Sequence, residues 1–213
     1  MKSRLNTQSS YDQVAVEYAE KYKDEMDDKP FDRGCLDRLA RQVGSLGLIC
    51  DLGCGPGQIA RYLHRHGVDT LGVDLSSRMI TEAQRLNPEI PFHQGDMLAL
   101  PDPDGSWGGI AAFYCIIHIP RAKIVRALRE MKRVLKPGGL LLVTFHIGEE
   151  VKHRDEWWGK PVNLDFAFYR PDEMEAWLKQ AGFGLQETLV REPNPAVEVA
   201  TQRAYIFANK SAE

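Results

Sequence analysis

The sequence predicts an α/β protein with a doubly wound, mostly parallel β-sheet flanked by helices, an N-terminal helical cover and a lid insertion before the last helix. Three observations support this fold class. Apolar, strand-like runs alternate with helix-length segments from Leu48 onward. The run "LLLVTFH" (140–146) is almost continuously apolar, which is typical of a parallel strand covered on both faces. Residues 148–168 then interrupt the alternation with charged and aromatic side chains.

Two helices are expected at the N-terminus, and Tyr18 and Tyr22 recur at helical spacing in the first of them. Ser76 follows the second strand and is expected to cap the helix after it. Pro171 and Gly182 are expected to begin and end the last helix. The "KPGG" segment is expected to end the helix before it, which starts near position 121. The expected strands lie at 48–52, 70–76, 91–96, 109–115, 140–146, 184–190 and 203–209.

The length of 213 residues suits one α/β domain, and we expect one. Within it we expect an N-terminal helical cover (1–46), a binding core (47–147), a lid or acceptor segment (148–170), and a C-terminal helix with two strands (171–213). The sequence contains no internal repeat that would suggest a solenoid.

The composition is that of an ordinary globular protein, with 43% hydrophobic and 27% charged residues. The net charge of −3 provides no cationic field for nucleic acid or an anionic membrane, so neither is an expected partner. No apolar run has the length of a signal peptide core or a membrane span. The four cysteines and six histidines lack zinc spacing. We therefore expect a cytoplasmic protein with reduced thiols and no metal.

The segment "DLGCGPG" (51–57) is the strongest functional signal. Glycine at a sharp strand-to-helix turn permits positive φ and close approach of a ligand to the backbone. The stretch from Gly55 to Ala60 also satisfies the GxGxxG/A dinucleotide pattern. However, Asp51 would repel a pyrophosphate, whereas it would attract the ammonium group of S-adenosylmethionine by about 1 to 4 kcal/mol at about 4 Å. The sign of this charge favours the methyl donor.

Two more aspartates follow neighbouring strands. Asp74 is placed to accept hydrogen bonds from ribose hydroxyls, which either ligand would offer. Asp96 is placed to accept from an adenine amino group while Met97 packs on the ring, although a turn-forming role for Asp96 stays open. Three aspartates without a nearby lysine or arginine describe a pocket for a cationic nucleoside.

The sequence resembles the class I, seven-stranded S-adenosylmethionine-dependent methyltransferases that act on small molecules. The resemblance rests on "DLGCGPG" (51–57), "GVDLS" (72–76), "GDMLALP" (95–101), "FYCIIHI" (113–119) and "MKRVLKPGG" (131–139). It implies that the residues around the glycine turn hold the methionine end and that Phe113 lies beneath the donor. The positions expected to contact the cofactor are Tyr11, Tyr18, Asp51, Gly53, Cys54, Gly55, Gly57, Asp74, Leu75, Met79, Gly95, Asp96, Met97 and Phe113.

Methyl transfer requires a base only when the acceptor must lose a proton. His118 is the preferred base and His146 the weaker candidate, since both follow strands at the crevice and an ordinary imidazole pKa near 6.5 suits that task. A loop-packing role for His118 stays open. An aromatic wall for a small acceptor is expected from Tyr22, Trp157, Trp158, Phe166, Phe168 and Tyr169. The rings of the lid segment would equally suit a small core of the lid itself.

Three functions compete. The first is a methyltransferase that moves a methyl group to an O, N or C atom of a small-molecule acceptor and releases S-adenosylhomocysteine. The second is a non-catalytic module that binds S-adenosylmethionine, and the third is an NAD-dependent oxidoreductase. The chain lacks an Asn-Pro-Pro-Tyr or Asp-Pro-Pro-Tyr segment after the fourth strand, which argues against methylation of nucleic acid bases. The sequence leaves the acceptor and the oligomeric state open.

Overall fold

A computed structural model describes residues 2–212, with side chains from residue 7 to 212. Its main sheet has seven strands in the order β3-β2-β1-β4-β5-β9-β8, and only β9 runs antiparallel to its neighbours. The predicted doubly wound, mostly parallel sheet is therefore confirmed. The strands are β1 (Ile49–Leu52), β2 (Thr70–Asp74), β3 (Phe92–Gln94), β4 (Trp107–Phe113), β5 (Leu135–His146), β8 (Gly184–Arg191) and β9 (Arg203–Asn209).

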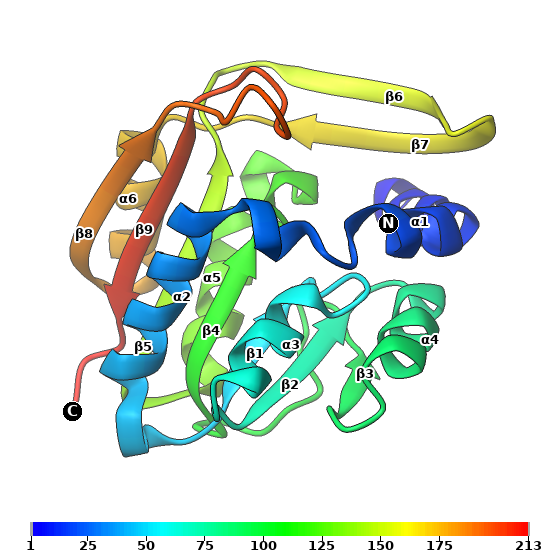
Figure 1. Ribbon diagram of the computed structural model, residues 1–213. Helices are drawn as coiled ribbons and strands as arrows, with labels where there is room; N and C mark the ends of the chain where they lie inside the picture. The colour runs from blue at the N-terminus through cyan, green and yellow to red at the C-terminus, as the bar shows by residue number, and fades with distance from the viewer. Residues whose placement is uncertain (1, 213) are drawn as a thin grey trace.

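Helices cover both faces of this sheet, as Figure 1 shows. One core lies between the sheet and helices α2 and α3 and contains Leu39 and Leu63. The other lies under α5 and α6 and contains Leu128 and Met174. The apolar residues recur at helical spacing, so each helix buries one stripe and leaves its polar face exposed. The helices are α1 (Lys2–Tyr22), α2 (Pro30–Val43), α3 (Gln58–Arg65), α4 (Ser77–Leu86), α5 (Ile124–Val134) and α6 (Pro171–Ala181).

Most of the predicted helix boundaries are confirmed. Ser76 caps α4, since its side chain accepts a hydrogen bond from the Met79 N–H. Pro171 begins α6 and Gly182 ends it with a φ of 87°. The "KPGG" segment differs, because α5 already ends at Val134 and strand β5 includes this segment. Proline has no N–H for a helical bond, and here the chain continues directly as an extended strand.

The predicted loop before the last helix is an ordered hairpin of two antiparallel strands, β6 (Val151–Trp157) and β7 (Lys160–Ala167). Val162 and Leu164 point to one face of β7 and pack with Val14 of α1. This alternation of period two was hidden among the charged residues of the segment. Figure 1 shows the hairpin extending over α1, away from the main sheet. Within residues 2–212, no helix combines the length and apolar character needed to cross a membrane.

Candidate cofactor and acceptor site

A cavity of about 700 Å³ lies at the carboxyl ends of β1, β2, β4 and β5. This is the edge at which ligands bind in doubly wound sheets, because the strand order reverses there. Helix α1 and the β6–β7 hairpin also contribute lining residues. The predicted site residues that line the cavity are Tyr11, Tyr18, Tyr22, Asp51, Gly53, Cys54, Gly55, Asp74, Leu75, Met79, Gly95, Met97, Phe113, His118, His146, Trp157, Phe166 and Phe168.

Four predicted residues do not line it. Gly57 packs instead against the Phe92 ring beneath the turn. The Asp96 carboxylate accepts the Leu98 N–H at 2.8 Å, so its adenine contact stays a prediction. Trp158 is 41% exposed at the tip of the hairpin. Tyr169 is fully buried and its hydroxyl donates to the Ile119 carbonyl at 2.9 Å, which corrects its expected place in an acceptor wall.

The backbone N–H groups of the glycine turn already donate hydrogen bonds within the protein. The N–H groups of Gly53 and Cys54 donate to the Val73 carbonyl at 2.7 and 3.1 Å. The Gly57 N–H donates to the Cys54 carbonyl at 2.9 Å. The Gly55 N–H donates to the Asp74 carboxylate at 2.9 Å. A diphosphate over this turn would find these four donors occupied and would face carboxylates, which counts against the dinucleotide reading.

The two aspartates at the turn are both buried. The Asp51 carboxylate accepts the Ala60 N–H at 3.0 Å from the first turn of α3. The Asp74 carboxylate accepts the Gly55 N–H with one oxygen and the Ser76 N–H, at 2.8 Å, with the other. Each carboxylate oxygen has a second lone pair, so capacity for a ligand remains.

Burial raises the pKa of Asp51 to about 8, and the nearby carboxylates of Asp74 and Glu25 add to the rise although the Ala60 N–H opposes it. Burial also raises the pKa of Asp74, against the N–H donors of Ser76 and Gly55. Glu25 lines the same end of the cavity and pairs with Lys29 at 2.7 Å. The site thus gathers carboxyl groups in a poorly solvated place, where a cationic ligand would stabilise their charged forms.

This pKa predicts how the ligand-free protein responds to pH. The folded-state pKa of Asp51 lies above its unfolded value of about 3.9, so the native state binds the extra proton. The free energy of unfolding therefore falls from about pH 4 to about pH 8, by at most about 1.4 kcal/mol for each pH unit. In Asp51→Asn, the free energy of unfolding should lack this part of its decrease with pH. Thermal unfolding at pH 5, 6.5 and 8 measures it, with exposed Asp69→Asn as the control; equal slopes in all three proteins would contradict the expectation.

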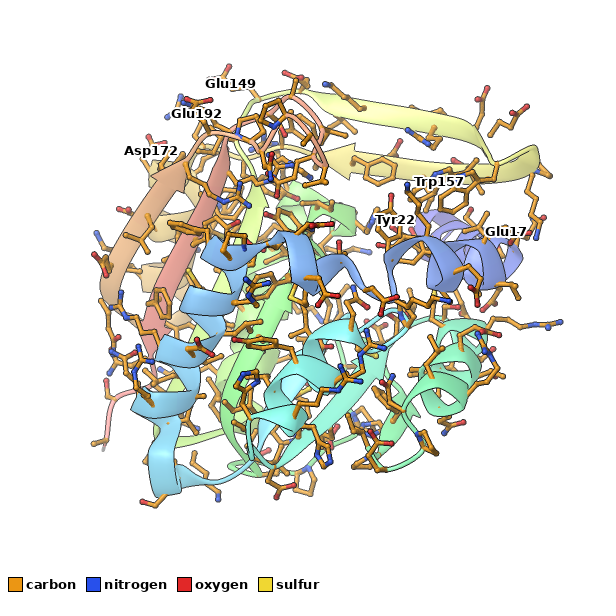
Figure 2. All side chains as sticks on the ribbon, in the orientation of Figure 1. Glu17, Tyr22, Glu149, Trp157, Asp172 and Glu192 are labelled. Carbon is orange, nitrogen blue, oxygen red and sulfur yellow. The ribbon has the colours of Figure 1, made fainter. Side chains whose placement is uncertain are left out.

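Aromatic side chains cover the turn from above. Tyr18 lies over Gly55, since a Cβ placed on that glycine would stand 3.6 Å from the tyrosine ring. Tyr18 and Tyr11 both contact Trp157 of the hairpin edge to face, with ring centroids 5.7 and 6.2 Å apart. Figure 2 shows Trp157 and Tyr22 between the hairpin and helix α1. The cover is therefore built jointly by α1 and β6.

The hydrogen bonds of His118 define its tautomer. Its Nδ1 lies 2.8 Å from the Asp165 carbonyl, which can only accept, so Nδ1 carries the proton. Its Nε2 then accepts the Tyr11 hydroxyl at 2.8 Å. Burial lowers the pKa of His118 to about 4. The expected pKa near 6.5 is thus wrong for this residue, because the imidazole is desolvated and its lone pair is already used to orient Tyr11.

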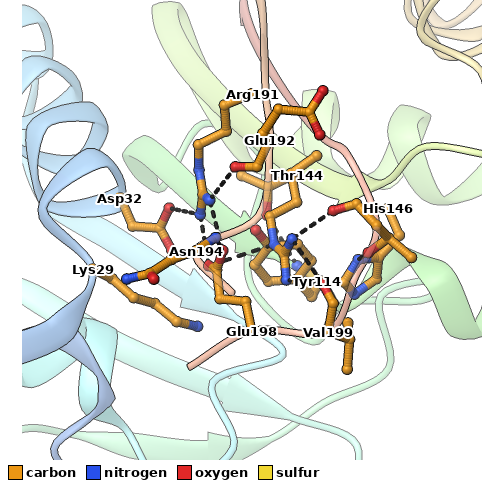
Figure 3. Close-up of polar contacts among 12 residues, drawn as sticks. Lys29, Asp32, Tyr114, Thr144, His146, Arg191, Glu192, Asn194, Glu198 and Val199 are labelled. Carbon is orange, nitrogen blue, oxygen red and sulfur yellow. Dashed lines mark hydrogen bonds and ion pairs between the residues drawn. The ribbon is translucent and has the colours of Figure 1, made fainter. Parts of the chain in front are cut away.

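The other end of the cavity contains residues that the sequence reading missed. Asp32 of α2 is fully buried, and one of its oxygens accepts from Arg191 at 3.1 Å and from the Tyr205 hydroxyl. Its second oxygen, Oδ2, has no hydrogen-bond partner among the described residues. Arg191 also forms two bonds of 2.7 Å to Glu198. Figure 3 shows this network beside Tyr114.

Tyr114 is the first residue after β4 and has a φ of 51°, a strained conformation for a residue other than glycine. Its hydroxyl lies 3.0 Å from that of Tyr205. The ring centroids of Tyr114 and His146 are 4.9 Å apart, and those of His146 and Phe168 are 5.3 Å apart. The His146 Nδ1 lies 2.8 Å from the Thr201 hydroxyl, and burial lowers the pKa of His146 to about 4. The position of Tyr114 at a strand end was the one available sequence signal for this group.

Comparison with known proteins identifies the architecture. Residues 49–139 match a family model described as a methyltransferase domain. Over this segment, which holds the glycine turn and Asp74, the chain is similar to S-adenosylmethionine-dependent methyltransferases of class I. The chain is 34% identical over 116 residues to demethylmenaquinone methyltransferase of Beutenbergia cavernae, covering 54% of this chain and 47% of the relative. It is 29% identical over 178 residues to the putative methyltransferase YqeM of Bacillus subtilis, covering 81% and 68%.

The whole fold of the chain recurs in a solved structure. Magnesium protoporphyrin IX methyltransferase from Synechocystis, solved with bound S-adenosylmethionine, superposes with a TM-score of 0.73 over 99% of this chain and 98% of that one, at 16% identity. At this identity the likeness concerns the fold alone. The alignments with the first three curated relatives span less than half of the length of each relative. They therefore concern a shared core of the chain and leave the rest of each relative unmatched.

The residues around the glycine turn fit S-adenosylmethionine. Two buried carboxylates at the glycine turn, Asp51 and Asp74, suit a ligand with an ammonium group, a sulfonium and ribose hydroxyls. Met79 and Met97 offer apolar, polarisable contact nearby. Over the described part of the chain, no three His, Cys, Asp or Glu side chains gather where they could hold a metal ion.

Proposed function

We propose that this protein transfers the methyl group of S-adenosylmethionine to an O, N or C atom of a small-molecule acceptor and releases S-adenosylhomocysteine. One observation carries the proposal. The buried carboxylates of the glycine turn and a separate polar end around Asp32 and Tyr114 line the same cavity. A donor at the first end leaves the second for another molecule. The names of relatives such as demethylmenaquinone methyltransferase support an acceptor of small size.

Catalysis in this proposal is mainly positional. When bound, S-adenosylmethionine supplies a methyl group on a sulfonium, which the lone pair of an acceptor takes by in-line displacement. The chain contributes by holding both molecules in line, which is worth about 7 to 11 kcal/mol of barrier reduction. Asp51 and Asp74 hold the donor end, while the cover of Tyr11, Tyr18 and Trp157 excludes water from it.

The polar end is the proposed acceptor subsite. Tyr205 donates to Asp32 and accepts from the Arg191 Nε at 2.9 Å, so the Tyr114 hydroxyl donates to Tyr205. This fixes the Tyr114 ring on the cavity side. The Oδ2 atom of Asp32 is the acceptor with capacity left for an O–H or N–H group of the acceptor molecule. An acceptor bound there would lie along the rings of Tyr114 and His146.

His118 is proposed as a positioning residue rather than as the base first expected. Glutamine can reproduce both of its hydrogen bonds, so His118→Gln should keep turnover within about tenfold and preserve the shape of the pH–rate profile. His118→Leu, which cannot accept from Tyr11, should reduce turnover further. A general base would instead contribute about a hundredfold to ten-thousandfold, so a loss of that size in His118→Gln with an altered pH profile would restore the catalytic role.

The function itself is tested by incubating the protein with methyl-labelled S-adenosylmethionine and a metabolite extract, followed by mass spectrometry. We expect label in one or a few small molecules, absent from a control with Asp74→Ala. Donor binding by calorimetry without labelled product from any extract would favour the non-catalytic module. Absence of donor binding would overturn the proposal.

A further inference from the structure

Four arginine and lysine side chains line the cavity, and three of them already have a carboxylate partner. Lys29 pairs with Glu25 at 2.7 Å, Lys152 with Glu150 at 3.4 Å, and Arg203 with Glu198 at 3.5 Å. The fourth, Arg154 of strand β6, has no carboxylate within ion-pair distance among the residues that the structure describes. A guanidinium without a carboxylate partner, at the wall of a binding cavity, is suited to bind an anionic group of a ligand.

Arg154 is also held in place. Its guanidinium carbon lies 4.8 Å from the centre of the Trp157 ring, a cation–π contact. Trp157 in turn contacts Tyr18, which lies over Gly55. Burial raises the pKa values of Tyr11 and Tyr22, and the charge of Arg154 opposes that rise in part.

The donor brings one anion, its carboxylate, into an end of the cavity that is otherwise acidic. Asp74 and Glu25 would repel that carboxylate. The N–H groups of residues 53, 54, 55 and 57 are occupied by internal hydrogen bonds, and Pro56 has none. These N–H groups therefore offer the carboxylate little, and Arg154 is the cavity cation that has no carboxylate partner of its own among the described residues.

We propose that Arg154 binds the carboxylate of S-adenosylmethionine and thereby ties the β6–β7 hairpin to the bound donor. The inference rests on the proposed function, since it takes S-adenosylmethionine as the ligand. Its consequence is that the donor site is completed by a strand about 100 residues after Asp51 in the chain, on a hairpin that packs on α1 and extends away from the main sheet. A donor without a carboxylate would leave the hairpin unattached to the ligand.

Calorimetric binding of two probes tests this directly: S-adenosylhomocysteine, and the same compound with its carboxylate replaced by hydrogen. The native protein should bind the carboxylate form about tenfold or more tightly. Arg154→Met should remove this preference while leaving the affinity for the decarboxylated probe unchanged. Lys152→Met, on the same strand and also at the cavity, should retain the preference. Arg154 is exposed, so its variant should fold, which circular dichroism checks.

Limited trypsin digestion gives a second measurement, because the Lys152–His153 bond remains a cleavage site in the hairpin of every Arg154 variant, whereas the Lys160–Pro161 bond resists trypsin. S-adenosylhomocysteine should slow cleavage there in the native protein, and the decarboxylated probe should not.

An unchanged carboxylate preference in Arg154→Met would overturn the inference while the function stands. Unchanged probe affinities with a lower kcat/KM for the methyl acceptor would assign the arginine to the acceptor and overturn it as well. No binding of either probe to the native protein would remove the function and the inference together.

Discussion

Replacing Gly53 by alanine should cost the protein several kcal/mol of unfolding free energy and abolish the donor site with it. Gly53 has a φ of 72°, and an added Cβ would stand 2.3 Å from the Cβ of Cys115. The left-handed backbone costs an alanine about 1 to 2 kcal/mol. Forcing a methyl group into the packed contact adds about 1 to 3 kcal/mol or more. Urea unfolding of the ligand-free protein measures the total.

Gly138→Ala is the matched control, because Gly138 has a φ of 76° and nothing within 4 Å of an added Cβ. It should show the backbone cost alone. The double variant Gly53→Ala with Cys115→Gly removes the clashing Cβ and should recover part of the loss. If Gly53→Ala and Gly138→Ala were equally stable, close contact between the turn and the chain after β4 would not be the reason for glycine at position 53.

Asp74→Ala should weaken the binding of S-adenosylhomocysteine by about a hundredfold, which corresponds to about 2.7 kcal/mol. Charge-assisted hydrogen bonds are worth about 1.5 to 3 kcal/mol, and the proposed ribose contacts are of this kind. The carboxylate also accepts the N–H groups of Gly55 and Ser76, so its removal leaves two donors of the turn without their partner. Calorimetric titration measures the loss.

Two variants separate charge from shape in this experiment. Asp74→Asn keeps one oxygen as an acceptor and should give an intermediate loss. Asp69→Ala changes an exposed aspartate at the opposite end of strand β2 and should leave the affinity unchanged. An unaltered affinity in Asp74→Ala would refute the proposed ribose contact, whatever the behaviour of the other two proteins.

The donor end of the site was open to prediction because a parallel sheet gathers its strand ends. Asp51 is the last residue but one of β1, Asp74 is the last residue of β2, and the two strands pair in parallel, so both carboxylates meet at one edge of the sheet. The glycine pattern marked the turn between them. Asp96 shows the limit of this reasoning, since a residue two positions beyond the end of β3 turns its carboxylate onto its own backbone.

The residues of the acceptor end could not be predicted in the same way. Asp32 and Arg191 are 159 residues apart; Asp32 lies on helix α2, and Arg191 ends β8, the edge strand on the other side of the sheet from β2 and β3. Their meeting depends on how α2 packs on the sheet and where the connector after β8 returns. Likewise, the sequence predicted a loop where the structure has the β6–β7 hairpin. The buried residues of the hairpin, Val162 and Leu164, face helix α1 and not the main sheet.

By itself, the sequence determined the alternating α/β architecture, the glycine turn and the sign of the charge beside it, since each depends on neighbours within one strand–helix unit. Only the tertiary structure decided that His118 is buried and engaged by Tyr11, and that Arg154 is the cavity cation without a carboxylate partner among the described residues. The physical reason is that solvation and pairing of a charge depend on every segment packed around it, and those segments are distant in the chain.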